Sequence, residues 1–151
     1  MNELQIIHAS LNDIDLLLAF MKRFYSIDGY PFNKEQSRAS LTEFFSQPNQ
    51  GMIWVVKENT IPIGYIILAV VYSFEFGGRN AFVDEFYLEK EYRGKGIGKM
   101  VIEYVVEEAK KMNIKALHLE VEQHNEKALN LYRAFQFTDH HRILMTRMIN
   151  E

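Results

Sequence analysis

The stretch YRGKGIGKM at residues 92–100 is decisive for the fold, because it places three glycines at alternate positions among cationic side chains. Glycine destabilises regular structure unless the backbone must turn unusually or approach another group closely. The residues that follow have helical spacing, and the free N–H groups of a helix N-terminus bind phosphate. Gly94, Gly96 and Gly98 therefore predict a phosphate-binding loop at the start of a helix.

Strands and helices alternate on both sides of this loop. Residues 81–89 (AFVDEFYLE) are rich in β-branched and aromatic side chains and predict a strand. Residues 101–112 carry apolar side chains on one face and charges on the other, which predicts an amphipathic helix. A further strand, a helix and a final strand are expected at residues 116–122, 125–135 and 143–149.

The N-terminal half predicts a strand, two capped helices and a hairpin. Residues 5–7 are expected to form the first strand. Ser10 with Asp13 resembles a capping box, and Asn33 with Gln36 is a second capping pair. The stretches MIWVVKE and IPIGYIILAVVYSF flank Asn-Thr and predict a hairpin. The resulting order, β-α-α-β-β-β-α-β-α-β, predicts an α/β fold with a mixed sheet flanked by helices.

Composition limits the function classes. A length of 151 residues with 48% hydrophobic side chains fits one domain over residues 1–151. The net charge of −3 argues against sequence-independent nucleic-acid binding, and the lack of cysteine excludes disulfides and thiolate chemistry. No apolar run is long enough to span a bilayer, and the N-terminal stretch lacks a secretory signal pattern. We therefore expect a cytoplasmic protein that binds neither nucleic acid nor membrane.

Three phosphate-binding motifs can be compared with the glycine loop. The nucleotide-triphosphate loop needs Gly-Lys-Ser/Thr, and the dinucleotide motif needs Gly-x-Gly-x-x-Gly near a first strand; neither is present. The third motif, Arg/Gln-x-x-Gly-x-Gly/Ala, matches Arg93, Gly96 and Gly98. Together with Asn125 and Tyr132 in the next strand–helix unit, this motif resembles the GCN5-related N-acetyltransferase (GNAT) family. The resemblance implies a single-domain GNAT-like fold with a mostly antiparallel sheet.

The resemblance also implies acetyl-CoA as cosubstrate. The pyrophosphate would lie on the backbone N–H groups of the glycine loop, where the helix dipole favours an anion. The pantetheine arm would pair with the end of the preceding strand, and Asn125 would either contact the cofactor or cap its helix. The implied cofactor-binding residues are Phe86, Tyr87, Leu88, Arg93, Gly94, Lys95, Gly96, Ile97, Gly98, Lys99 and Asn125.

One position departs from the family pattern. The family usually has Gly-Phe after the helix that carries Tyr132, whereas this chain has Gln136-Phe137. A helix end of this kind prefers a positive φ, so the sequence predicts mild backbone strain at Gln136.

Acetyl transfer to an amine needs a base for the ammonium proton and a proton for the leaving thiolate. The resemblance makes Tyr132 the acid, although its helical spacing also suits a core residue. Glu85 is the first candidate for the base and Glu120 the second, and either could equally be a solvated strand carboxylate. Strand alternation predicts that Asp84 faces away from Glu85.

A second group of polar residues could suggest a metal. His118, Glu120, Glu122 and His124 would share one strand face, but successive side chains on a face lie about 6.5–7 Å apart. That spacing is too wide for neighbours to share an ion easily. We expect no metal.

The resemblance implies an acceptor pocket lined by the first two helices, their loop and the central hairpin. Aromatic and acidic side chains there suit an organic cation, and we expect a small-molecule primary amine. A peptide amine (an N-terminus or a lysine) and a non-catalytic acyl-CoA-binding module are the alternatives, and a homodimer is left open. The implied acceptor residues are Tyr25, Asp28, Tyr30, Phe32, Glu75 and Phe76.

Overall fold

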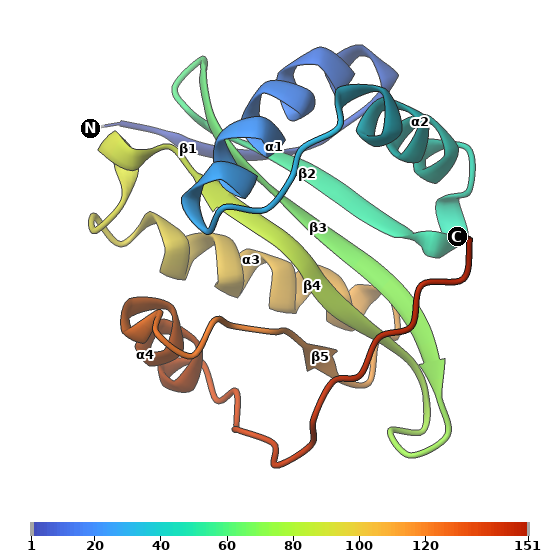
Figure 1. The fold of residues 1–151 in the computed structure, drawn as a ribbon. Coiled ribbons are helices and arrows are strands. Elements are labelled where there is room, and N and C mark those ends of the chain that lie inside the picture. Colours follow the sequence, from blue (N-terminus) through green and yellow to red (C-terminus); the bar gives the residue numbers. More distant parts are fainter. Residues whose placement is uncertain (1, 151) are drawn as a thin grey trace.

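The computed structural model describes residues 2–150 and contains one five-stranded sheet in the order β1-β2-β3-β4-β5 (Figure 1). The pairs β1–β2, β2–β3 and β3–β4 are antiparallel, and β5 pairs with β4 in parallel. The predicted mixed, mostly antiparallel sheet is therefore confirmed. The strands are β1 (Leu4–His8), β2 (Gly51–Glu58), β3 (Ile61–Ser73), β4 (Gly78–Leu88) and β5 (Leu117–His118).

Helices cover both faces of the sheet. Helices α1 (Ile14–Ile27) and α2 (Lys34–Phe45) pack on one face, around a buried cluster that includes Leu17. Helix α3 (Ile97–Lys111) packs on the other face, and α4 (Glu126–Ala134) lies beside it, below β4 in Figure 1. Within residues 2–150, no helix combines the length and the apolar character that crossing a membrane requires.

The predicted helix caps are confirmed. The backbone N–H of Ser10 donates to Asp13 Oδ2 at 2.8 Å, and the Ser10 side chain accepts in return. The side chain of Asn33 accepts a hydrogen bond from the N–H of Gln36 at 3.0 Å. Ser10 caps the short 3₁₀ turn Leu11–Asp13 that leads into α1, and Asn33 caps α2. Each cap satisfies a donor that a helix N-terminus leaves unpaired.

A β-bulge interrupts β4 at Asp84. Ile67 lies opposite Glu85, but the next residue, Leu68, lies opposite Val83, so Asp84 has no partner on β3. The extra residue shifts the alternation of side chains. Val83 accordingly packs in the α3 cluster, while Asp84 and Glu85 both line the cavity under α2. The prediction that Asp84 faces away from Glu85 is therefore wrong.

Two predicted strands differ in the structure. Pairing of β5 with β4 stops at Phe82–His118, so the strand expected over residues 116–122 is only two residues long. The final strand expected at residues 143–149 does not form. Because β5 ends so early, this segment has no continuation of β5 to pair with, and its apolar side chains, such as Ile143, are exposed.

The strain expected after the helix of Tyr132 is present. Gln136 has a φ of 68°, and α4 ends in hydrogen bonds from Phe137 N–H to the Tyr132 carbonyl and from Gln136 N–H to the Arg133 carbonyl. This pattern is a Schellman motif, which favours glycine at the left-handed position. The Phe137 ring completes it by packing edge-on against Tyr132, with centroids 5.7 Å apart.

Replacing Gln136 with glycine should raise the melting temperature by about 2–4 °C. Left-handed backbone costs a residue with a side chain roughly 1–2 kcal/mol, and the entropy of a new glycine offsets roughly 0.5–1 kcal/mol of the relief. The variant should therefore gain up to about 1 kcal/mol in the free energy of unfolding. For a chain of about 150 residues, 1 kcal/mol corresponds to a rise in melting temperature of about 2–4 °C. Calorimetry measures it, with Asn113→Gly as control, because Asn tolerates its φ of 59° better. A lower melting temperature in Gln136→Gly would contradict the strain.

Candidate functional site

The glycine loop leaves the N-terminus of α3 open. Gly94 and Gly96 have φ values of 74° and 83°, and a side-chain carbon at either would meet nothing within 4 Å. Gly96 is the N-cap, and no side chain caps the helix within the described residues. The backbone N–H groups that begin the helix are therefore available to an anion.

Gly98 has different surroundings from the other two glycines. It lies in the first turn of α3, and a side-chain carbon there would lie 3.5 Å from Leu131 of α4 and 4.0 Å from Phe86 of β4. Both distances are ordinary van der Waals contacts, so packing against these neighbours does not by itself require glycine at this position.

Arg93 braces the loop from within. Its Nε donates to the carbonyl of Leu88 at 2.7 Å, and its guanidinium lies 5.4 Å from the ring centre of Tyr87. These contacts tie the loop to the end of β4. The ammonium of Lys95 lies 5.5 Å from the ring centre of Tyr92, beside the same loop.

The second half of β4 has one unpaired edge. Residues 85–88 pair with β3, but β5 pairs only with Ala81 and Phe82 of β4. In Figure 1 the chain after β5 runs toward α4 below β4. Backbone groups of successive strand residues point alternately to the two edges, so Phe86 and Leu88 face the gap, whereas the Tyr87 carbonyl lies toward Gly64 of β3. The Leu88 carbonyl already accepts from Arg93. An extended ligand can enter this gap as an added strand.

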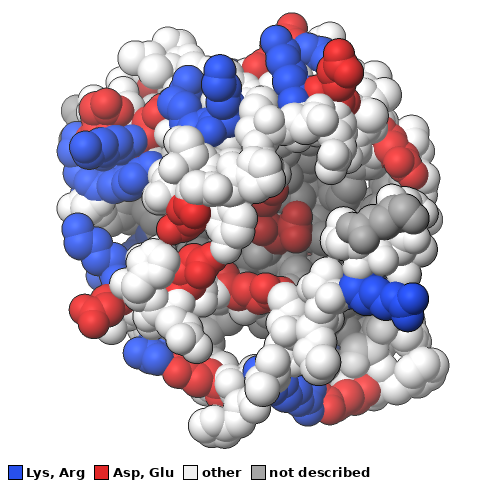
Figure 2. All heavy atoms as spheres, viewed as in Figure 1, with Lys and Arg blue, Asp and Glu red and all other residues white. Residues whose placement is uncertain are grey.

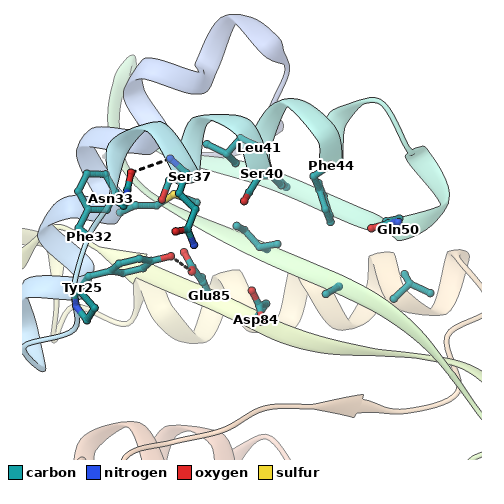
Figure 3. Close-up of a pocket in the computed structure, with 17 residues that line it drawn as sticks. Tyr25, Phe32, Asn33, Ser37, Ser40, Leu41, Phe44, Gln50, Asp84 and Glu85 are labelled. Atoms are coloured by element: carbon teal, nitrogen blue, oxygen red, sulfur yellow. Dashed lines mark hydrogen bonds between the residues drawn. The ribbon is translucent and has the colours of Figure 1, made fainter. Parts of the chain in front are cut away.

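A cavity of 830 Å³ lies between α2 and the sheet (Figure 3). Tyr25 and Phe32 contribute aromatic walls, with their ring centres 5.8 Å apart. Asp84 and Glu85 point into the cavity from β4. Figure 2 shows acidic atoms in the hollow at the centre of this face. None of the described residues that line the cavity is Lys, Arg or His.

Glu85 is held by two phenols. Tyr25 and Tyr65 donate hydrogen bonds to its two oxygens at 2.5 and 2.6 Å. Burial raises the pKa of Glu85 above its usual value, while both hydrogen bonds oppose this shift. A carboxylate with a raised pKa and a fixed orientation has the properties of a general base.

Asp84 is the second carboxylate of the cavity. Its side chain is exposed to the cavity, and the surrounding protein still raises its pKa by desolvation. The two neighbouring acids therefore lie in a concave site without a counter-ion among the described residues.

The other acceptor candidates lie outside this cavity. Asp28 contacts His124 at 3.3 Å, and Tyr30 hydrogen-bonds to Glu122. These two contacts join the loop between α1 and α2 to the segment between β5 and α4.

The two candidates from the turn between β3 and β4 lie near the C-terminal segment. Glu75 forms a bidentate pair with Arg142 at 2.9 and 2.8 Å, and Phe76 packs on His118 with ring centres 4.6 Å apart. The structure brings neither into the cavity that holds Glu85.

Tyr132 and Glu120 line a second cavity of 920 Å³ beside β5 and α4. Tyr132 is half-buried, and burial raises its pKa to about 12, so its phenol is protonated at neutral pH. Glu120 is exposed. Asn125 accepts a hydrogen bond from the N–H of Ala128 at 3.2 Å, so it caps the helix that carries Tyr132.

Sequence reasoning missed several lining residues. Asp84 was misplaced because nothing in the strand pattern marks the bulge, and Tyr65 was hidden in an apolar run. The polar wall from α2, including Ser37 and Ser40, could have been found from helical periodicity, because both face the sheet beside buried Leu41.

The grouping of His118, Glu120, Glu122 and His124 on one strand face does not form, because β5 ends at His118. Over residues 2–150 the structure contains no cluster of three or more His, Cys, Asp or Glu arranged to hold a metal ion.

Solved structures share this architecture. An integron cassette protein from the mobile metagenome of Cole Harbour Salt Marsh superposes with a TM-score of 0.86 at 26% identity, over 97% of this chain and 91% of that one. A predicted acetyltransferase from Clostridium acetobutylicum, solved with acetyl-CoA, has a TM-score of 0.82 at 22% identity, over 96% of both chains.

Sequence comparison gives relatives and a family. A thialysine N-epsilon-acetyltransferase from Mus musculus is 34% identical over 76 residues, which are 50% of this chain and 44% of that protein. The chain spans about half the length of the curated relatives that it matches. The model of the acetyltransferase (GNAT) family matches residues 16–137. Since that match covers most of the chain, the protein belongs to the GNAT family.

Proposed function

We propose that this protein is an acetyl-CoA-dependent N-acetyltransferase whose acceptor is a small cationic primary amine. The observation that carries the proposal is Glu85, a half-buried, oriented carboxylate in an acidic cavity. It lies on β4, whose edge beyond Phe82 is not paired with β5. The names of the thialysine acetyltransferase relatives support an amine acceptor of small size.

The residues present fit the cosubstrate. The open space over Gly94 and Gly96 and the uncapped start of α3 suit a pyrophosphate, and the unpaired edge of Phe86 to Leu88 suits an amide-bearing arm. Acetyl-CoA supplies an acetyl group activated as a thioester. The arm would bring the acetyl group to the level of Glu85, because Glu85 and the open edge that the arm would pair with belong to the same strand, β4.

Glu85 would take the proton that the ammonium must lose before it attacks. An aliphatic ammonium has a pKa near 10, so a base close to it raises the fraction of reactive amine. Tyr25 and Tyr65 hold the carboxylate in one orientation by donating to both oxygens. The proton moves to Glu85 directly or through one water.

Tyr132 would supply the proton for the departing thiolate. Its phenol keeps its proton at neutral pH and makes no hydrogen bond within the described residues. The Schellman motif and the Asn125 cap fix both ends of the helix that carries it.

A panel of primary amines, followed by the release of free coenzyme A, tests the proposal. Acetylation of a small diamine, an amino sugar or a free amino acid supports it. Coenzyme A affinity without thiol release on any amine would instead identify a binding module, and turnover on peptides alone would identify a peptide acetyltransferase.

Gly96→Asn should weaken acetyl-CoA binding by about tenfold or more. The new side chain would enter the space offered to the pyrophosphate, and loss of one charge-assisted hydrogen bond corresponds to a change of that order. Gly77→Asn is the matched control, because Gly77 has nearly the same φ, 82°, and equally open surroundings in a remote turn. Calorimetry measures both affinities. Equal affinities in the two variants would rule out the phosphate site.

Tyr132→Phe should lower kcat by ~10²–10⁴-fold, the range for a positioned acid. The ring that packs against Phe137 is kept, so the melting temperature should change little. Tyr104→Phe, on the α3 side against Trp54, controls for loss of a phenol elsewhere. Unchanged turnover in Tyr132→Phe would make Tyr132 a packing residue only.

Glu85→Gln should lower kcat/KM at neutral pH by roughly tenfold or more, with partial recovery at high pH as free amine appears. Glu120→Gln should have a smaller effect, because Glu120 is exposed and lies in the other cavity. The pH profiles of both variants decide the assignment. A raised KM with unchanged kcat and no recovery would mean that Glu85 only binds the cation, and the reverse ranking would transfer the role to Glu120.

A further inference from the structure

We propose that the acceptor carries a second cationic nitrogen and no carboxylate, and that Asp84 is the residue that selects it. This inference rests on the proposed function and specifies its substrate class. It starts from the bulge in β4, which turns Asp84 into the cavity beside Glu85.

The two acids cannot have the same role in the reaction. Glu85 accepts the proton of the attacking nitrogen, so its negative charge is cancelled when that nitrogen becomes reactive. Asp84 is not held by the phenols that orient Glu85, and its side chain is open to the cavity. Asp84 is therefore free to hold a charge that persists through the reaction.

A second ammonium group on the acceptor matches that charge. Adjacent residues have their Cα atoms about 3.8 Å apart, so the two carboxylates lie within the reach of one short aliphatic diamine. Tyr25 and Phe32 line the cavity beside them and suit the methylene chain between the two nitrogens.

A carboxylate on the acceptor would have no cationic partner among the described lining residues. The described lining contains two acids and no Lys, Arg or His, and its α2 wall offers neutral groups such as Ser37 and Ser40. A free amino acid would place its carboxylate among like charges, which is unfavourable in a partly desolvated site. Thialysine is an amino acid, so the inferred acceptor differs from the compound named for the relatives.

Three amines of matched length test the inference. Cadaverine, pentylamine and lysine share a five-carbon chain that ends in a primary amine; cadaverine adds a second ammonium group, and lysine adds a carboxylate as well. With the full chain and acetyl-CoA, kcat/KM for cadaverine should exceed that for each of the other two by about tenfold or more. The advantage over pentylamine should arise in KM.

Asp84→Asn should bring the ratio of cadaverine to pentylamine toward one, while Glu103→Gln, an exposed acid on the opposite face of the sheet, should keep it. Equal kcat/KM for cadaverine and pentylamine in the natural protein, or lysine equal to cadaverine, would overturn the inference and leave the proposed function standing. Acetylation of none of the three, nor of any amine in the wider panel, would overturn both. The comparison of amines needs no variant, so it holds even if Asp84→Asn does not fold.

Discussion

The separation of β5 from β4 is the constraint on which the rest of the site depends. Parallel pairing ends after Phe82 and His118, and from there β4 continues with one edge open. The backbone N–H and C=O groups of an open strand edge need hydrogen-bond partners, which can be another strand, a ligand or water. The gap leads to the glycine loop at one end of β4 and passes Glu85 on the way. One feature of strand pairing thus aligns the proposed anion site, the open edge and the Glu85 carboxylate along a single strand.

The two faces of the sheet differ in how tightly they are packed. The α3 face carries the close packing, in a buried cluster that includes Val101, Ile102 and Val105. The α1 and α2 face keeps space, and its polar groups are oriented by hydrogen bonds such as those from Tyr25 and Tyr65 to Glu85. The bulge at Asp84 shifts the alternation of side chains along β4. Val83 packs on the α3 face, whereas Asp84 and Glu85 both face the cavity under α2.

Local signals were enough to predict the helix caps, the hairpin and the strained Gln136, since each depends on a few neighbouring residues. The bulge and the length of β5 depend on pairing between distant segments, which a single strand pattern does not contain. The same limit explains the final strand, because residues 143–149 are rich in apolar side chains but β5 ends at His118 and leaves them no continuation to pair with. Among the acceptor candidates, Tyr25 and Phe32 lie in the cavity, whereas Glu75 is paired with Arg142 elsewhere.

The unbalanced charge of the cavity also bears on how a turnover ends. Acetylation converts an ammonium into a neutral amide, so the product would carry one positive charge fewer than the amine that entered. With Glu85 as the proposed base, the return of its proton to water would leave two carboxylates that attract the product less than the next molecule of amine. Product release limits many enzymes. In this cavity the loss of the ammonium charge would itself weaken the electrostatic attraction for the product, without any movement of the chain.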